Sequence, residues 1–237
     1  MSLYIILMGV QGAGKGEQAR FIQETYGIPQ VSTGDLFRAM KTRTDALAQR
    51  IQQIMAEGKL IDDDTTNAVV EDRLAQPDAT NGVILDGYPR TPAQAEWLDA
   101  YLQKQGKRVN AVLLLELDLY TAFKRSFGRI KSDKTGRTYN VYYNADELAD
   151  WKFEDHPEGA YPPRLVATHR DGERLSRRAD DASADAVLKR IDTFMNTTTP
   201  LIEFYKRKHP SLLVTIDAAQ SIEQVSEQIR SAIDIRK

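Results

Sequence analysis

The sequence contains no cysteine among its 237 residues, which excludes disulfide bonds, zinc sites built from thiolates and a cysteine nucleophile. Its longest apolar runs, such as residues 3–10, are far shorter than the roughly 20 residues that a membrane-spanning helix requires. No basic segment precedes that run, as one does in a signal peptide. We therefore expect a cytoplasmic protein that binds no membrane.

Neither sign of charge is in excess. The chain has 32 Lys and Arg against 34 Asp and Glu, a net charge of -2, so it is not a nucleic-acid binder that relies on overall positive charge. Any anion-binding site must be local. The 14 glycines and nine prolines are too few for a low-complexity chain. At roughly 150 residues per domain, the length predicts one large domain or one domain with an insertion.

Segments typical of buried strands alternate with segments of helical pattern. The expected strands are residues 3–8, 30–32, 82–85, 111–117 and 212–216. The expected helices are residues 14–26, several within 35–76, then 92–105, 184–208 and 221–235. This alternation is typical of βαβ units and predicts an α/β fold with a five-stranded parallel sheet flanked by helices.

Residues 128–181 break the alternation. They show no long helical period, and they hold three of the nine prolines and six of the nineteen aromatic residues. A structureless loop of this length is improbable within a compact domain. We expect a small folded insertion, rich in hairpins because residues 138–143 have strand propensity.

A glycine-rich loop, residues 9–16 (GVQGAGKG), joins the first strand to the first helix. Its backbone amides, the helix N-terminus and Lys15 are suited to surround an anion, as in a P-loop. The usual pattern places Ser or Thr after the lysine, whereas this chain has Gly16 and so lacks that magnesium-binding hydroxyl. A tight strand-to-helix turn is the alternative, and the flanking elements argue against it.

This loop and five later motifs resemble, in the same order, those of the adenylate kinase family of nucleoside monophosphate kinases. The later motifs are STGDLFR at 32–38, GKLI at 58–61, DGYPRT at 86–91, KRSFGR at 124–129 with GRTY at 136–139, and RADD at 178–181. The resemblance covers residues 9–202. It implies a P-loop NTPase fold with a core domain (1–31, 62–127 and 182–237), a monophosphate-binding segment (32–61) and a lid (128–181).

The resemblance further implies reversible transfer between MgATP and AMP to give two ADP, by direct in-line attack. An amide side chain can pair with adenine, so Gln94 with Thr33 favours AMP as the acceptor. Kinases of pyrimidine monophosphates usually have Asn where this chain has Thr91. A UMP, CMP or other monophosphate kinase is the first alternative, and a catalytically silent nucleotide sensor, supported only by Glu17, is the second.

The resemblance assigns roles residue by residue, and cations predominate because two nucleotides bring many negative charges together. The implied catalytic residues are Lys15, Arg90, Arg125, Arg129, Arg178 and Arg190. The implied ATP-binding residues are Gly12, Ala13, Gly14, Lys15, Gly16, Glu17, Arg125, Arg129, Tyr139 and Gln220. The implied AMP-binding residues are Thr33, Arg38, Lys59, Ile61, Gly87, Arg90, Gln94, Arg178 and Arg190. Asp86 would bind Mg²⁺ through water. We expect a monomer without structural zinc that binds ATP, AMP and ADP but no nucleic acid.

Three features depart from the family pattern. Glu17 stands where the family has Thr, and we expect it to face away from the triphosphate or to reach the metal through water. Asn140 replaces a common His, with an effect expected on lid packing only. Many relatives hold the lid together with zinc. Here we expect Trp151, Phe153 and Tyr161 to form an apolar nucleus in its place, and the alternative is that these residues form a docking surface for a partner.

Overall fold

The computed structural model describes residues 2–56, 61–154, 164–177, 181 and 183–237. The chain divides into two compact units. Unit 1 consists of Met1–Gly9, Gly14–Glu116 and Asn196–Lys237, and unit 2 consists of Val10–Ala13 and Leu117–Met195.

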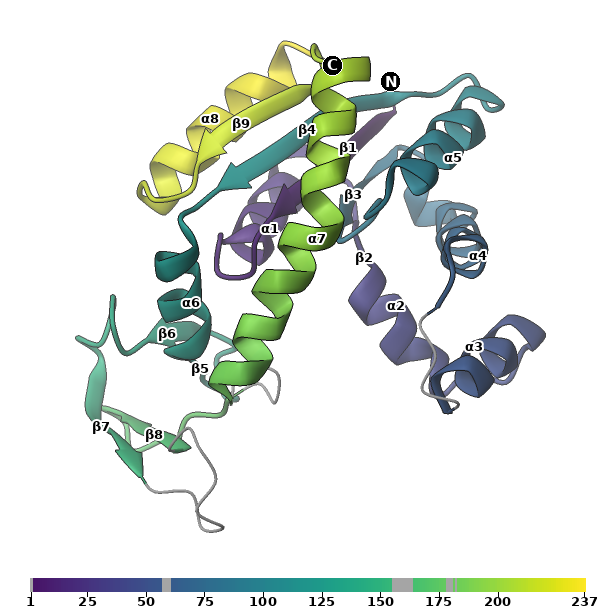
Figure 1. The fold of residues 1–237 in the computed structure, drawn as a ribbon. Coiled ribbons are helices and arrows are strands. Elements are labelled where there is room, and N and C mark those ends of the chain that lie inside the picture. Colours follow the sequence, from purple (N-terminus) through teal and green to yellow (C-terminus); the bar gives the residue numbers. More distant parts are fainter. Residues whose placement is uncertain (1, 57–60, 155–163, 178–180, 182) are drawn as a thin grey trace. The chain divides into compact units, whose positions relative to one another are not determined.

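Unit 1 is built on a five-stranded sheet in which every pairing is parallel, as the alternating pattern predicted (Figure 1). Its strands are β1 (Leu3–Gly9), β2 (Gln30–Ser32), β3 (Gly82–Asp86), β4 (Val109–Glu116) and β9 (Leu213–Asp217). The spatial order is β2-β3-β1-β4-β9, with β1 in the centre. All seven residues of β1 are buried, which is why its sequence is continuously apolar.

Helices connect these strands. They are α1 (Lys15–Tyr26), α2 (Thr33–Met40), α3 (Ala46–Ala56), α4 (Asp63–Leu74), α5 (Pro92–Gln103), the long α7 (Ala184–Lys208) and α8 (Ile222–Asp234), with a 3-10 turn η1 at Pro77–Ala79. Four of these helices, α2, α4, α5 and α8, begin at an N-cap residue whose side chain accepts a hydrogen bond from the backbone N–H three residues later. The capping residues are Ser32, Asp62, Thr91 and Ser221. In the described part of the chain, no helix is long and apolar enough to cross a membrane.

Successive residues of β1 point to opposite faces of the sheet. Tyr4, Ile6 and Met8 belong to a core cluster with Leu98 of α5 and Tyr205 of α7. The other face carries α1 and α8, which contact each other and the strands. Helices on both faces make this a doubly wound sheet. Such sheets bind ligands beyond the carboxyl ends of their strands, which here include Gly9, Ser32 and Asp86.

A smaller apolar cluster holds α2, α3 and α4 together. Met40, Ala48, Ile51 and Val69 are almost fully buried in it, and Ile61 packs against them. Ile61, predicted to bind AMP, is therefore anchored in the described structure by this packing.

Unit 2 contains α6 (Leu119–Phe127) and two antiparallel strand pairs. The pairs are β5 (Arg129–Lys131) with β6 (Thr138–Asn140), and β7 (Leu148–Glu154) with β8 (Arg164–His169). The two pairs confirm the prediction that this insertion is folded and rich in hairpins. The sequence did not predict α6.

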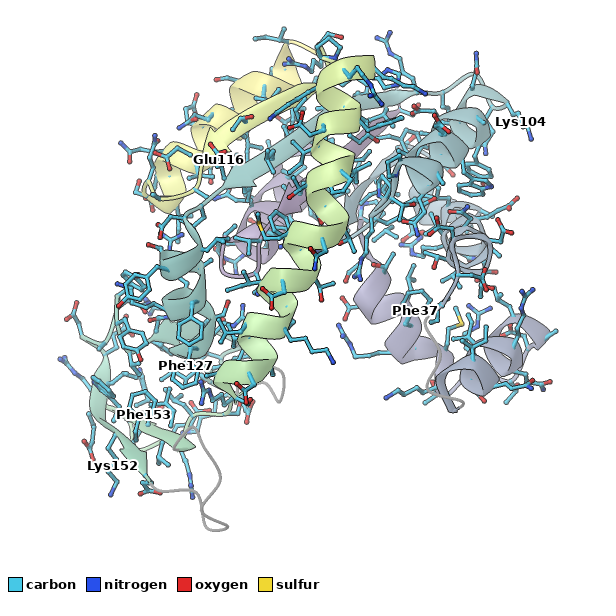
Figure 2. The ribbon with its side chains drawn as sticks, in the orientation of Figure 1. Phe37, Lys104, Glu116, Phe127, Lys152 and Phe153 are labelled. Atoms are coloured by element: carbon cyan, nitrogen blue, oxygen red, sulfur yellow. The ribbon has the colours of Figure 1, made fainter. Side chains whose placement is uncertain are left out.

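The apolar nucleus of unit 2 differs from the expected one. It consists of Ile130, Tyr139, Val141, Leu148, Leu165, Ala167 and Leu175, with Phe153 packed against it. Trp151 is 38% exposed, meets the Phe153 ring edge-on and is not among the described residues of this cluster, so its assignment to the nucleus was wrong. Phe153 stacks on Phe127 at the end of α6, with ring centroids 5.8 Å apart (Figure 2). Tyr161 lies outside the described residues.

A polar network adjoins this nucleus. The Glu173 carboxylate, 9% exposed, accepts from Ser132 Oγ at 2.6 Å and from the backbone N–H of Lys134 at 3.0 Å. Asp171 in turn accepts from the backbone N–H of Glu173, and its Oδ1 lies 2.9 Å from His169 Nδ1. These hydrogen bonds join the loop after β5 to the loop after β8 in a chain that has no cysteine to bind zinc there.

Candidate active site

The glycine-rich loop has the backbone geometry that its sequence predicted. Gly12 and Gly14 have φ values of 88° and 87°, in the left-handed region that favours glycine. Gly14 is also the N-cap of α1, so the free amides of the first helical turn follow it directly. Lys15 Nζ donates to the Gly9 carbonyl at 2.6 Å.

Gly12 is further required by a close approach to α6. A Cβ atom at Gly12 would lie 2.6 Å from the Ala122 carbonyl oxygen and 3.1 Å from Ser126 Oγ. At Gly16, by contrast, a Cβ would meet no described atom within 4 Å. Packing explains Gly12, whereas the protein itself does not require Gly16 to lack a side chain.

Asp86 ends β3 at the carboxyl edge of the sheet, and Gln30 Nε2 donates to its Oδ2 at 3.0 Å. Burial raises the pKa of Asp86, and the nearby positive charges of Lys15 and Arg90, with the Gln30 hydrogen bond, partly oppose that rise. Unit 1 therefore places two cations within electrostatic reach of the Asp86 carboxylate, with the Asp35 carboxylate also near.

The loop after β3 is held by hydrogen bonds to one carbonyl group. The Gly87 oxygen accepts from Thr33 Oγ1 and from Arg90 Nε, each at 2.9 Å. Gly87 has a φ of 76°, and a Cβ there would lie 3.1 Å from Thr33 Oγ1. Thr33, Gly87 and Arg90, three residues predicted to bind AMP, are thus linked through one carbonyl group, and the Arg90 side chain is exposed.

Gln94 occupies the first turn of α5 and is 4% exposed. Its amide Nε2 donates to Asp63 Oδ1 and its Oε1 accepts from the Arg90 backbone N–H, both at 2.7 Å. Asp63 also accepts from Thr91 Oγ1 at 2.9 Å. Gln94 is therefore linked to the backbone of Arg90 and to the start of α4.

Arg38 lies on α2 with its side chain exposed, and it pairs with Asp35 one turn earlier. Asp35 is thus a salt-bridge partner, and Ser32 rather than Asp35 caps the helix.

Glu17 pairs with Arg20 within α1. That pair gives the Glu17 carboxylate a partner inside its own helix.

Two predicted arginines of unit 2 share one buried carboxylate. Arg129 donates from Nε and Nη2 to Asp181 Oδ2 at 2.8 and 2.6 Å, and Arg190 Nη1 donates to Asp181 Oδ1 at 2.9 Å. Asp181 is completely buried. It joins the first residue of β5 to α7 and sets the spacing of the two guanidinium groups.

Arg125, at the end of α6, lies with its guanidinium carbon 5.8 Å from the centre of the exposed Tyr143 ring. The Arg125 backbone carbonyl accepts from Asn140 Nδ2 at 2.9 Å, and Asn140 Oδ1 accepts from the Tyr142 N–H. Asn140 therefore ties α6 to β6, in line with the packing role expected for it. Tyr139 is 3% exposed, and its side chain is buried in the nucleus of unit 2.

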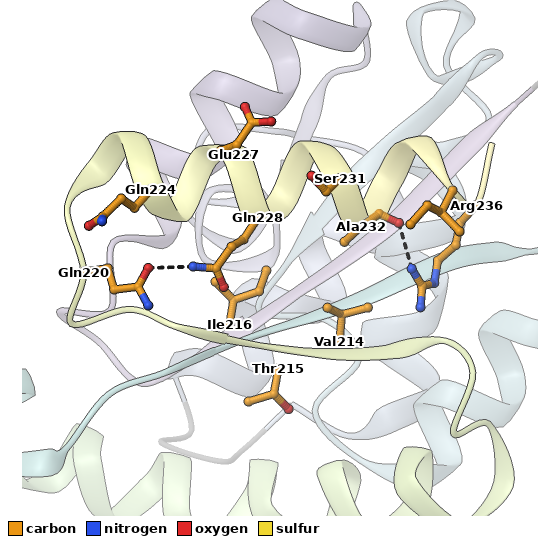
Figure 3. A pocket seen from close by; sticks show the side chains of 11 residues that line it. Val214, Thr215, Ile216, Gln220, Gln224, Glu227, Gln228, Ser231, Ala232 and Arg236 are labelled. Carbon is orange, nitrogen blue, oxygen red and sulfur yellow. Dashed lines mark hydrogen bonds between the residues drawn. The ribbon is translucent and has the colours of Figure 1, made fainter.

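Gln220 lines a groove of about 560 Å³ between β9 and α8, where it accepts from Gln228 Nε2 at 2.6 Å (Figure 3). Among the described residues lining this groove, Gln220 alone belongs to the predicted site.

Lys59 and Arg178 lie outside the described residues. Within the described ranges, no group of three or more carboxylates and histidines could hold a metal ion.

Sequence reasoning gave no role to Asp63 or to Gln30, and named Asp181 only as part of a motif. Asp63 carries one signal, because an acidic residue in the first turn of a helix is common. That pattern does not reveal its partner 31 residues later. The pairing of Asp181 with Arg129 spans 52 residues and is visible only in the fold.

Comparison with known proteins decides the family. A model of the family described as "Adenylate kinase" matches residues 7–210. The chain belongs to the adenylate kinase family. It is 38% identical to an adenylate kinase of Symbiobacterium thermophilum over 232 residues, covering 98% of each chain. It is 38% identical to one of Moorella thermoacetica and 34% identical to one of Bacillus subtilis, each over 97% of both chains.

Membership of the adenylate kinase family makes the chain a nucleotide-binding phosphotransferase. The five-stranded parallel sheet and its P-loop fit that family fold. Adenylate kinases bind ATP and AMP and use magnesium-bound ATP, and a zinc site built on cysteines is excluded by composition.

Proposed function

We propose that the chain catalyses ATP + AMP ⇌ 2 ADP by direct in-line transfer. One oxygen of the AMP phosphate attacks the terminal phosphorus of ATP, the bond from that phosphorus to the bridging oxygen breaks, and both products are ADP. No general base is needed, because the attacking phosphate oxygen is already ionised at neutral pH.

The observation that carries this proposal is the group at the carboxyl edge of the unit 1 sheet. Lys15, Asp86 and Arg90 interact electrostatically there, and Thr33 and Gly87 adjoin Arg90. We assign Arg38 and Arg90 to the AMP phosphate, because a guanidinium can bind two phosphate oxygens and so orients the acceptor as well as attracting it. Lys59 and Ile61 complete the proposed AMP site.

On the donor side, we assign the residues of the glycine-rich loop, with Lys15, to the ATP phosphates. Arg125 would stack on the donor base. Arg129 and Arg190, spaced by Asp181, would stabilise the charge that develops on the transferred group, together with Arg178.

The residues at the end of β3 are compatible with Mg²⁺ bound to ATP. Asp86 offers a carboxylate close to the proposed phosphate site that would accept hydrogen bonds from metal-bound water, which suits a small cation that keeps most of its water. Mg²⁺ would neutralise phosphate charge when bound. Gly16 has no hydroxyl, so Asp86 is the residue we assign to orient the metal's water.

We also propose the three-part organisation of the family for this chain: a core of residues 1–31, 62–127 and 182–237, a monophosphate-binding segment 32–61, and a lid 128–181 that excludes water from the reaction. That the chain acts as a monomer in the cytoplasm stays a prediction.

A coupled assay of ADP formation with AMP, UMP, CMP and GMP as acceptors tests the proposal. We expect AMP to be the preferred acceptor and Arg90→Ala to reduce kcat/KM for AMP by ~100-fold or more, since a charge-assisted hydrogen bond to the reacting phosphate is lost. Full activity of that variant would refute the proposed acceptor site. Preference for a pyrimidine monophosphate would refute the choice of AMP.

A further inference from the structure

The amide of Gln94 is held in one orientation by two partners of opposite character. Asp63 Oδ1 accepts from its Nε2, and the Arg90 backbone N–H donates to its Oε1. An ionised carboxylate only accepts hydrogen bonds and a backbone N–H only donates them. Turning the amide over would oppose oxygen to oxygen and N–H to N–H, and Gln94 is too deeply buried for bulk water to compensate.

Asp63 is itself fixed. It is the first residue of α4, and its second oxygen accepts from Thr91 Oγ1 at 2.9 Å. Thr91 Oγ1 in turn accepts from the Gln94 backbone N–H at 3.1 Å, which caps α5. The carboxylate thus connects the beginnings of two helices, and its position does not depend on Gln94 alone.

An amide group has two N–H donors and two acceptor lone pairs. The contacts to Asp63 and Arg90 use one of each, and the described residues supply no further partner to the amide. One N–H and one lone pair remain. They fit a base edge with an acceptor beside a donor, as N1 and N6 of adenine are, and they oppose the reversed pattern of hypoxanthine, with N1–H beside O6.

We propose that Asp63 is a positioning residue that sets the base specificity of the acceptor site by orienting the Gln94 amide. This inference rests on the proposed function, in which Gln94 contacts the acceptor base. The carboxylate itself touches no substrate. Its acceptor-only chemistry makes the amide present the pattern that adenine matches.

The test compares Asp63→Asn with Asp64→Asn, since Asp64 lies in the same helical turn, is exposed and carries the same charge. An Asn at position 63 can either donate or accept, so the Gln94 amide is no longer fixed. We expect the preference for AMP over IMP, as a ratio of kcat/KM values, to fall at least ~10-fold, within the range that one bidentate base contact contributes. KM for ATP should stay within about twofold, and Asp64→Asn should resemble the wild type.

A double variant, Asp63→Asn with Gln94→Glu, covers the possibility that the single variant fails to fold. It restores complementary partners, because the Asn amide can donate to the new carboxylate, but it presents only acceptors to the base. We expect it to fold and to lose the preference for AMP over IMP, because each base brings one donor and one acceptor to a group that only accepts. A folded double variant that keeps the wild-type AMP-to-IMP ratio would show that the atoms oriented by Asp63 do not select the base.

AMP and IMP binding to each folded variant, measured by calorimetry, supplies a readout that needs no transfer. An unchanged AMP-to-IMP ratio in folded Asp63→Asn, or an equal loss of affinity for both nucleotides, would overturn the inference. If the wild-type chain transfers phosphate to neither nucleotide while calorimetry still shows the Asp63-dependent preference, the proposed reaction fails and the role of Asp63 stands.

Discussion

Arg129 directs two nitrogen atoms at a single oxygen of Asp181, 2.6 and 2.8 Å away, and no solvent reaches that carboxylate. Because the other oxygen holds Arg190, the geometry of both guanidinium groups depends on this one residue. We expect Asp181→Asn to lower kcat by ~10–100-fold, since misplacing charged groups by about 1 Å has an effect of that size.

The matched control for Asp181→Asn is Asp185→Asn, which removes the same charge from an exposed position in the first turn of α7. It should keep the wild-type kcat. Steady-state kinetics with circular dichroism to verify folding measure the effect, and equal activity of the two variants would show that Asp181 does not position the arginines.

Gly12 and Gly16 of the P-loop have different surroundings, and this difference gives a second prediction. Gly12→Ala forces an unfavourable φ and places a Cβ 2.6 Å from the Ala122 oxygen, so we expect it to lower the free energy of unfolding by ~2–4 kcal/mol. Gly16→Ala meets no described atom and should change that free energy by less than ~0.5 kcal/mol. Urea unfolding of both variants measures this, and equal losses would contradict it.

Asp86 gives a pH-dependent prediction. Because burial raises its folded-state pKa above the unfolded value of about 3.9, the stability linked to its protonation is present below that value and is lost as pH rises through the folded-state pKa. Asp86→Asn should therefore be more stable than the wild type at pH 7, and the gain should shrink toward pH 4. In the proposed role of Asp86, the same variant should lose most of its magnesium-dependent activity.

Urea midpoints at pH 7 and pH 4 test the Asp86 prediction without any substrate. If the urea midpoint of Asp86→Asn at pH 7 equals or falls below that of the wild type, the ionised Asp86 carboxylate does not destabilise the folded protein.

The polar network around Glu173 and Asp171 in unit 2 predicts the opposite pH dependence. The backbone N–H of Glu173 and the side chain of His169 together lower the pKa of Asp171 to about 2. A carboxylate with a lowered pKa contributes stability above its unfolded pKa, and that contribution is lost as pH falls toward the folded value. Hydrogen exchange in β7 and β8 should be faster in Asp171→Asn than in the wild type near pH 6. The difference should narrow between about pH 4 and pH 2.

Asp133→Asn is a suitable control for Asp171→Asn, since Asp133 is also exposed but its side chain accepts from Ser176 Oγ rather than from Glu173. If Asp171→Asn and Asp133→Asn accelerate exchange equally and without dependence on pH, the Asp171 carboxylate is not what holds the two loops together.

The sequence was sufficient to predict the sheet and the P-loop, because β1 is apolar throughout and Gly12 and Gly14 need left-handed backbone. It did not predict α6. Trp151 was misplaced because it shares a face of β7 with Phe153, and the strand pattern does not say that Phe153 reaches the nucleus while Trp151 stays exposed. Asp63 and Asp181 could not be paired with Gln94 and Arg129, since those contacts depend on how distant segments pack.

The most direct test of the account is ³¹P NMR of the wild-type chain with MgATP and AMP. We predict that two ADP form for each AMP consumed, that inorganic phosphate stays near background, and that no ADP forms when AMP or Mg²⁺ is omitted. Formation of ADP and inorganic phosphate at an equal rate without AMP, or no ADP in the complete mixture, would contradict the proposed phosphoryl transfer.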